Sequence, residues 1–421
     1  MIVSRLLSTY QNTPSKLLIE MFLYFMLAQD LRTRSDKDNL VWVSVTKDVA
    51  DGLVSNPDVA TVIQESHEDE DAGLVLIGFD AELLPALIYK IQKDLISHEG
   101  GFVVHPLGKN AGLDYIERVK LGDRSVFNKP EINNHEVGES LLKSVDTNKM
   151  MEFYTNLIKD FSTRYAFSKE GSKASTWIKK QFEEVSSTRN DIEVKTVTHP
   201  AKFKKQKSII VTIPGSEEPG EIVIIGAHLD SISDLDGEMS NTKPAPGADD
   251  DGSGMAVIME ALRVIVESGY VPKKTVQIMA FAAEEMGLVG SEDIASQYKA
   301  DNKNVIGMLM FDAVGNRGMI DFALTKDFSN SDHTDFVASL IKEYLPACTY
   351  VFFTNGYYEA SDHAAWNGYG YPSTLACESE KNPKYHTEQD VLENIDEDSM
   401  SNFAKLAVAY LAELAKGTVS R

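Results

Sequence analysis

The sequence predicts a mixed α/β fold, in which a mainly parallel sheet is sandwiched by helices and is preceded by a smaller α/β unit. Beyond about residue 200, short apolar runs rich in β-branched residues alternate with stretches of helical periodicity. Continuously apolar strands are typical of a sheet that is buried on both faces. The 421 residues, 43% of them hydrophobic, are enough for two or three units with a substantial core.

The smaller unit is expected over residues 36–125. Strands are predicted at Leu40–Val45, Leu74–Phe79 and Phe102–Val104, with a further strand or helix at Val59–Ile63. The apolar residues of Ala81–Ile96 recur on one side of a helix, and an acidic loop is expected at His67–Asp71. No catalytic motif occurs in this unit.

Residues 126–144 are expected to form a linker to a catalytic domain that covers residues 145–421. Periodicity is weak from about residue 108 to residue 144, which includes Lys129-Pro130 and Asn133-Asn134. In the larger domain, helices are predicted at Asn148–Phe161, Ser172–Glu184, Gly254–Val266 and Met400–Leu414, and strands at Ser208–Ile213, Ile222–Ile225, Val276–Phe281 and Val305–Phe311.

Residues 1–35 form a candidate leader segment. The apolar run Leu17–Ala28 follows Arg5 and Lys16, which is the order of an export signal. Glu20 interrupts the run, so an amphipathic helix is the alternative. The run is too short to predict a membrane span.

Charge and cysteine content exclude several kinds of function. The formal net charge of −23 argues against binding to nucleic acid or to an anionic membrane surface. Cys348 and Cys377 allow one disulfide or none, and they exclude a multi-cysteine zinc site. Any metal ligands must therefore be His, Asp and Glu.

Two acidic segments follow a predicted strand or open a predicted helix. His228 and Asp230, two residues apart after the strand Ile222–Ile225, can face one site in extended chain. The triplet Asp249-Asp250-Asp251 opens a helix and is read either as a set of metal ligands or as solvated charges that favour the helix dipole.

Three further segments complete the candidate site. Glu284-Glu285 follows the strand Val276–Phe281, Asp312 follows Val305–Phe311, and His386 lies in a late polar loop. Taken singly, Asp312 is equally a turn cap and His386 a surface residue. Taken together, two histidines and several carboxylates suit zinc, manganese or cobalt in a hydrolytic site.

In order and spacing, these segments resemble the di-zinc aminopeptidases typified by secreted bacterial leucyl aminopeptidases. The similarity runs from about Val145 to the C-terminus. It is carried by GAHLDS (226–231), PGADDDGSG (246–254), AAEEMGLVGS (282–291), FDAVGN (311–316), SDHAAW (361–366) and ESEKNPKYHT (378–387).

The resemblance implies a zinc-exopeptidase fold and two Zn²⁺ per catalytic domain. It implies that His228 and Asp312 bind one metal, that Glu285 and His386 bind the other, and that Asp249 bridges them. It further implies that Asp230 orients the histidine and that Glu284 is the general base. Water activated by the two zinc ions would then release N-terminal residues, by family default leucine or another bulky apolar residue, from peptides with a free N-terminus.

One loop departs from the family pattern. Secreted relatives carry a disulfide-bonded loop before the SDH segment, whereas residues 354–360 here contain no cysteine. Tyr357, or alternatively Tyr358, is expected to contact the reaction intermediate.

The expected protein is a monomer that is secreted, or periplasmic as the alternative, without stable membrane association. Its N-terminal unit is expected to be a removable prosegment that inhibits the enzyme, with a permanent accessory domain as the alternative. Two other functions are weighed against the aminopeptidase: a glutaminyl cyclase or carboxypeptidase-like enzyme on the same fold, and a non-catalytic binding protein.

Overall fold

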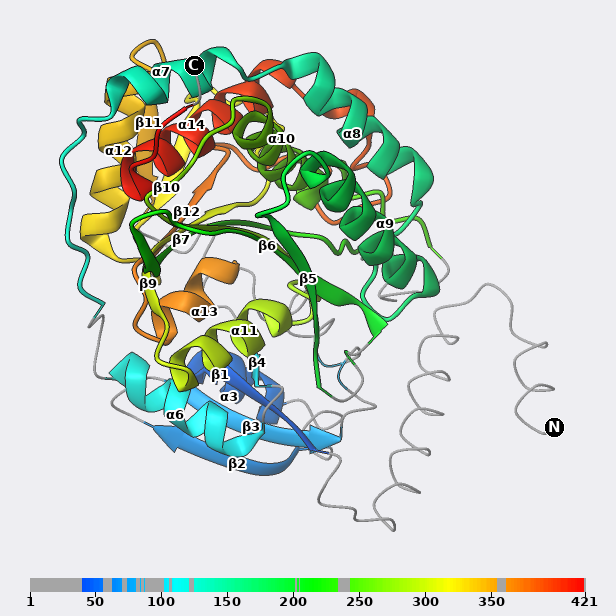
Figure 1. Ribbon diagram of the computed structural model, residues 1–421. Helices are drawn as coiled ribbons and strands as arrows, with labels where there is room; N and C mark the ends of the chain where they lie inside the picture. Colours follow the sequence, from blue (N-terminus) through cyan, green and yellow to red (C-terminus); the bar gives the residue numbers. More distant parts are fainter. Residues whose placement is uncertain are drawn as a thin grey trace.

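The computed structural model describes residues 40–55, 63–69, 74–80, 84, 87, 102–105, 108–120, 125–200, 203, 205–233, 243–353 and 361–419. The described chain forms a small N-terminal unit and a larger domain, which lie against each other (Figure 1). The leader residues 1–35 and the loop 354–360, which holds Tyr357 and Tyr358, lie outside the described residues.

The N-terminal unit is a four-stranded sheet with helices packed on it. Strands β1 (Leu40–Thr46), β2 (Ile63–Asp69), β3 (Leu74–Asp80) and β4 (Phe102–His105) are joined in the order β2-β3-β1-β4, and the helices are α3 (Lys47–Ser55) and α6 (Lys109–Lys120). The strands predicted at 40–45, 74–79 and 102–104 are confirmed. The acidic loop predicted at 67–71 is wrong for residues 67–69, which belong to β2, and most of the predicted helix 81–96 lies outside the described residues.

The larger domain is built on an eight-stranded mixed sheet with the order β11-β10-β12-β9-β7-β8-β6-β5. Its strands are β5 (Glu193–Thr198), β6 (Lys207–Ile213), β7 (Glu218–His228), β8 (Lys274–Phe281), β9 (Asn304–Phe311), β10 (Phe322–Thr325), β11 (Tyr350–Phe353) and β12 (Ser373–Cys377). The central strands β12, β9, β7 and β8 are mutually parallel. The predicted mixed, mainly parallel sheet is confirmed.

Helices cover both faces of this sheet. One face carries α8 (Thr147–Asp160), α9 (Lys169–Ser186), α10 (Gly254–Glu267), α12 (Ser331–Tyr344) and α14 (Glu397–Ala415); the other carries α11 (Val289–Ala300) and α13 (Asp362–Gly368) (Figure 1). Helix α10 is buried along nearly its whole length. This explains why its sequence is apolar except for the stripe Glu260, Arg263 and Glu267, whose side chains pair with one another.

The segment expected to be a linker contains a packed helix. Helix α7 (His135–Lys143) lies within residues 126–144, and its Val137 and Leu141 are buried in the main core of the larger domain. Helix α6 likewise falls where weak periodicity predicted none. The connection between the two units is therefore largely folded against the larger domain.

Two other findings bear on the sequence predictions. Cys348 and Cys377 are free thiols, so no disulfide joins them. Among the described residues, no helix is both long enough and apolar enough to cross a membrane.

Parallel strands bring the predicted site segments together. Strands β7, β8, β9 and β12 end at the same edge of the sheet, and their carboxyl ends lead into residues 228–230, 282–285, 312–316 and 378–386 respectively. Such an edge is the usual place for a binding site in an α/β sheet.

Candidate metal centre

Asp250 lies between the two histidines of the site. Its Oδ1 is 3.0 Å from Nε2 of His228, and its Oδ2 is 2.9 Å from Nε2 of His386. Nε2 of His386 is also 3.1 Å from Oε2 of Glu285, and Nε2 of His228 is 3.5 Å from Oδ1 of Asp312. Five side chains from four strand ends thus converge on one buried place.

The side chains group in a way that suits metal binding. Ligand atoms of His228, Asp250 and Glu285 all lie within 4.8 Å of one another, as do those of His228, Asp251 and Asp312. In the second group, Asp251 is already engaged with the backbone, because Oδ2 accepts from His228 N (2.9 Å) and Oδ1 from Gly254 N (2.9 Å). Asp251 therefore holds the backbone next to His228 in place.

The geometry does not favour the bridging role expected for Asp249. Oδ1 of Asp249 accepts the backbone N–H of Gly315 (2.8 Å), and Oδ2 accepts from Nδ2 of Asn382 (3.0 Å). These bonds turn the side chain away from the histidines. The difference arises because the segment Ala248–Ser253 has non-helical dihedral angles at Asp250 (φ −106°, ψ 98°) and Asp251, which aim successive carboxylates in different directions.

The Glu284-Glu285 segment is fixed through its backbone. Ala282 N donates to Oγ of Ser208 (2.9 Å), Ala283 N to Oε1 of Gln206 (3.0 Å), and Glu284 N to Oδ1 of Asp230 (3.0 Å). Asp230 is fully buried, and its Oδ1 lies 3.6 Å from Nδ1 of His228. Asp230 thus touches both the histidine and the glutamate loop, which fits the orienting role expected for it.

Both histidines carry a raised pKa. Burial alone lowers the pKa of His228, but the Asp312 and Glu284 carboxylates, with Asp230 and Asp250, raise it well above its usual value. Burial also opposes the charge of His386, whereas Glu285 and Asp250 bring its pKa to about 10. Positive charge is therefore strongly favoured at the centre of the site.

The pKa values of the two glutamates are raised as well, but here burial is the main cause. Burial raises the pKa of Glu284 well above its usual value, and Glu285 adds to the shift while His228 opposes it. Burial, together with Asp250, brings the pKa of Glu285 to about 7, against the effect of His386. Among the described residues, the carboxylates of this site thus outnumber the cationic groups near them, which are the two histidines, Arg164 and Lys381.

Two buried residues outside the predicted set hold the loops in place. Arg164 donates from Nε to the carbonyl of Leu229 and from an Nη to the carbonyl of Gly247, each at 2.9 Å, and so joins the loops after β7 and before α10. Asp390 accepts the backbone N–H groups of Asp249 (2.9 Å) and Asp250 (3.1 Å). No sequence pattern marked either residue, because their roles depend on backbone groups that are remote in sequence.

Comparison with known proteins places this site among peptidases. Residues 208–411 match the model for Peptidase family M28. Leucine aminopeptidase 1 of Ajellomyces capsulatus is 36% identical over 301 residues, which cover 68% of this chain and 75% of that protein. Its counterpart in Trichophyton equinum is 35% identical over 301 residues, covering 68% and 78% respectively.

Solved structures extend the likeness. The LapA aminopeptidase of Legionella pneumophila has 26% sequence identity and a TM-score of 0.70, covering 89% of this chain and 98% of its own. LapB of the same organism, also 26% identical, has a TM-score of 0.75 and covers 89% and 99%. A glutaminyl cyclase of Tannerella forsythia shares the fold at 18% identity, with a TM-score of 0.54 and coverage of 63% and 98%.

Proposed function

The chain belongs to peptidase family M28 and is a peptide-bond hydrolase, and from this premise we propose that it is a di-zinc aminopeptidase that releases N-terminal residues from peptides. The observation that carries the proposal is the position of Asp250, whose two carboxylate oxygens face one histidine each. A bridging carboxylate is what a site for two neighbouring metal ions requires.

The donor set fits zinc. Imidazole nitrogen and carboxylate oxygen are ligands that zinc accepts, and the described part of the site offers no thiolate. Nε2 of His386 and Oδ2 of Asp250 are buried without a hydrogen-bond partner although they lie 2.9 Å apart. A shared cation satisfies two such lone-pair donors and offsets the surplus negative charge.

We assign His228 and Asp312 to one zinc ion, Glu285 and His386 to the other, and Asp250 to both. This keeps four of the five ligands expected from the sequence and replaces Asp249 by its neighbour. When bound, the metal ions lower the pKa of water and stabilise negative charge on the peptide carbonyl oxygen. The remaining tasks fall to the protein's own side chains.

Glu284 is proposed to move the proton. It lies beside the ligand Glu285, is buried, and has its backbone fixed by Asp230. A carboxylate in this position can take a proton from the attacking water and give it to the amine of the departing peptide. Burial raises the pKa of Glu284, which favours its taking up the proton that it then passes on.

The acidic centre also accounts for exopeptidase action. A free N-terminal ammonium group is attracted to a site rich in carboxylates, whereas an internal or acetylated peptide nitrogen carries no charge to attract. Preference for leucine or another bulky apolar residue is proposed from the similar leucine aminopeptidases.

The test is a substrate panel assayed with the purified, metal-loaded protein. Leucine p-nitroanilide and Leu-peptides should be cleaved, and N-acetyl-leucine p-nitroanilide should not. Conversion of N-terminal glutamine peptides to pyroglutamate without peptide hydrolysis would instead identify a glutaminyl cyclase, which shares this fold. Binding of peptides without any turnover would indicate a non-catalytic protein.

Three predictions from the sequence remain proposals. These are export of the protein, its monomeric state, and removal of the N-terminal unit as an inhibitory prosegment. The last is supported if limited proteolysis that removes this unit raises the activity on leucine p-nitroanilide.

A further inference from the structure

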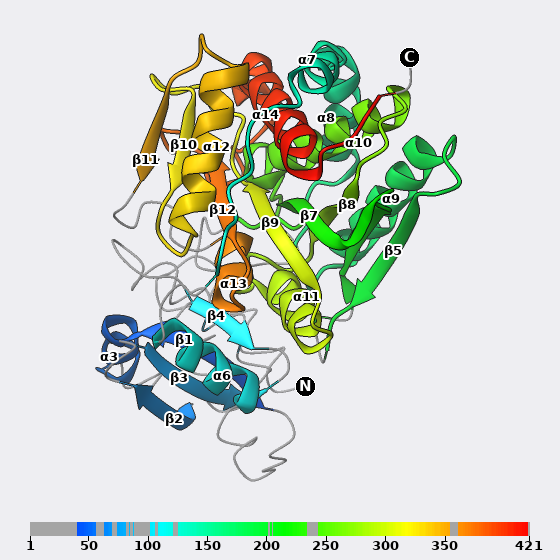
Figure 2. The same cartoon turned by 60° about the vertical axis from the view of Figure 1, so that its left-hand side comes forward.

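We propose that contacts from the N-terminal unit hold the loop that carries Glu284 and Glu285 in its active position. Catalysis therefore depends on these contacts. This inference rests on the proposed function of that site. It concerns residues that position the loop, and none of them is a catalytic residue. The contact surface is formed by β4 and α6 on one side and by loop 283–289, α11 and α13 on the other (Figure 2).

The first contact is made by the edge strand β4. Its outer edge is met by the glutamate loop, because Val104 N–H donates to the carbonyl of Gly287 (2.9 Å). Gly287 has φ +96°, and a Cβ there would lie 2.6 Å from the Phe102 ring and 2.6 Å from Val104. The loop thus packs so closely against the N-terminal unit that Gly287, two residues after Glu285, has no room for a side chain.

The second contact is apolar and surrounds the same loop. Ala283, Met286 and Val289 share a buried cluster with the core of the N-terminal unit. Leu288 shares another cluster with Val103 and Tyr115. Apolar surface of this kind, if uncovered, would lie in water next to the catalytic glutamates.

The third contact is a buried polar chain across the boundary. Nε2 of His105 is 2.7 Å from Oγ of Ser44, and Nδ1 is 3.0 Å from Oε1 of Glu292, which also accepts from the Tyr369 hydroxyl (2.7 Å). Ser44, His105 and Glu292 are each at most 2% exposed. A buried carboxylate that loses such a partner is strongly destabilised, so His105 anchors α11, the helix directly after the loop.

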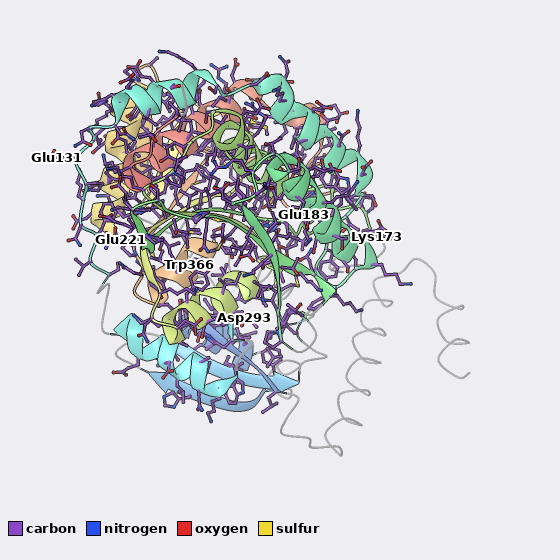
Figure 3. The ribbon with its side chains drawn as sticks, viewed as in Figure 1. Glu131, Lys173, Glu183, Glu221, Asp293 and Trp366 are labelled. Carbon is purple, nitrogen blue, oxygen red and sulfur yellow. The ribbon has the colours of Figure 1, made fainter. Side chains whose placement is uncertain are left out.

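Helix α11 also contacts the loop indirectly through Asp293, the residue after Glu292. Oδ2 of Asp293, labelled in Figure 3 on the helix that faces the N-terminal unit, lies 2.7 Å from Nδ1 of His199. Nε2 of His199 is 2.7 Å from Oγ of Ser208, and Ser208 accepts the backbone N–H of Ala282. This Ser-His-Asp set is fully buried, so it serves to hold the loop and has no access to substrate.

The loop needs this support because its backbone is strained. Ala283 and Leu288, which bracket Glu284–Gly287, have φ values of 55° and 59°. Left-handed backbone at residues other than glycine is strained, and it persists only where the surroundings hold it. Both side chains lie in the clusters that the N-terminal unit completes.

The crystallised relatives LapA and LapB match more of this chain than its catalytic region. The proposed catalytic region, residues 145–421, is about two thirds of the chain, yet the LapA and LapB structures match 89% of it. Part of the N-terminal unit therefore has a counterpart in those structures. The support role and the inhibitory prosegment predict opposite effects when the contacts are weakened.

The experiment uses the full chain loaded with zinc and compares two interface variants with a matched control. His105→Ala removes the polar chain and Phe102→Ala removes the packing on Gly287, while His105→Gln restores an amide donor to Glu292. The control, His333→Ala, deletes an equally buried histidine whose Nε2 lies 2.8 Å from the Tyr410 hydroxyl in the distant α12–α14 layer.

We expect kcat on leucine p-nitroanilide to fall about 10- to 100-fold in both interface variants, because small displacements of a catalytic group cost rates of this size. KM and the zinc content should stay near the parent values, and His105→Gln should recover part of kcat. Amide hydrogen exchange at residues 282–290 should accelerate in the metal-free interface variants. His333→Ala should lose thermal stability without these effects.

Interface variants that keep the parent kcat and the parent exchange rates would overturn the proposal, even if the N-terminal unit were unfolded in them. A rise in kcat would do the same and would favour the inhibitory prosegment. An inactive parent protein would count against the proposed function alone, because the exchange measurement tests the support of the loop without any turnover.

Discussion

Asp249 and Asp250 are adjacent in sequence, but their side chains serve different parts of the site. Asp250 faces His228 and His386, whereas Asp249 is bonded to Gly315 and Asn382 on two neighbouring loops. Asp249 therefore holds together the loops that carry ligands. A change at either residue should affect metal binding, but by different mechanisms and to different extents.

Asp250→Asn should lose bound metal. The substitution replaces one carboxylate oxygen by an NH2 group and leaves the other as a neutral amide oxygen, so neither metal ion keeps its charged ligand. Asp249→Asn should keep both metals when they are supplied in excess, with an affinity weaker by about 10- to 100-fold, as is usual for a residue that holds a ligand in place. Elemental analysis after dialysis checks both. Retention of metal by Asp250→Asn together with its loss from Asp249→Asn would restore the original assignment.

Glu284→Gln should leave the metals bound and lower kcat by about 10²–10⁴-fold, because a positioned proton-transfer group is lost while the shape is kept. Zinc content and kcat on leucine p-nitroanilide are the two measurements. Glu284→Asp, which keeps the carboxylate but shortens its reach, is the matched control and should retain more activity. Equal activity of Glu284→Gln and the parent would remove Glu284 from the mechanism.

The sequence predicted these residues to different degrees. His228, Asp230, Glu284, Glu285 and Asp312 follow predicted strands, and parallel pairing then brings them to one edge of the sheet. The choice among three consecutive aspartates depends on irregular dihedral angles at Asp250 and Asp251, which no periodicity encodes. Residues that act through remote backbone groups, such as Arg164 and Asp390, leave no local pattern at all.

The strength of the hydrophobic pattern along the sequence decided which helices could be predicted. Helix α10 is mostly apolar and was expected, whereas α6 and α7 are more polar. In α7 only a few residues are buried. Val137 and Leu141, together with the partly buried Leu142, attach α7 to the core. Their burial depends on α14, from the far end of the chain, and so it follows from tertiary packing.

The contact between α12 and α14 should make stability depend on pH. His333 on α12 is buried beside Tyr410 on α14, and burial lowers its pKa from 6.5 to about 3. The unfolded chain binds a proton below pH 6.5, whereas the folded chain does so only below about pH 3. The stabilisation is therefore complete above pH 6.5 and declines as the pH falls toward 3, by about 1.4 kcal/mol per pH unit.

Thermal melts of the metal-free protein between pH 7.5 and pH 4.5 check this, with His333→Gln as the comparison. The parent should lose more stability across this range than the variant, which has no proton to take up at residue 333. Parallel pH profiles for the two proteins would show that His333 does not contribute.

For the whole molecule, the surplus of buried carboxylates links metal binding to stability. Asp250, Glu284, Glu285 and Asp312 lie around the two histidines, and in the described part of the site Arg164 and Lys381 add positive charge without matching the number of carboxylates. Burial raises the pKa of both glutamates. Chelation should therefore lower Tm as well as activity. Metal at 1,000 times its Kd stabilises the folded state by about 4 kcal/mol, which sets the expected size of the effect.

Calorimetry with and without a chelator, followed by zinc re-addition, measures this change. The larger domain should account for most of it, because all the proposed metal ligands belong to that domain. A Tm that is unaffected by chelation, in protein shown by elemental analysis to have lost its metal, would contradict the link between metal and stability.

Two metal ions, with Asp250 as a ligand of both, are proposed to make this chain an aminopeptidase. The most direct test is to titrate metal-free protein with zinc while following both binding and hydrolysis of leucine p-nitroanilide. We expect no activity without metal, full activity at about two zinc ions per chain, and neither stable zinc binding nor activity in Asp250→Asn. Full activity in protein free of metal, or saturation at a single ion with Asp250→Asn still active, would contradict the proposal.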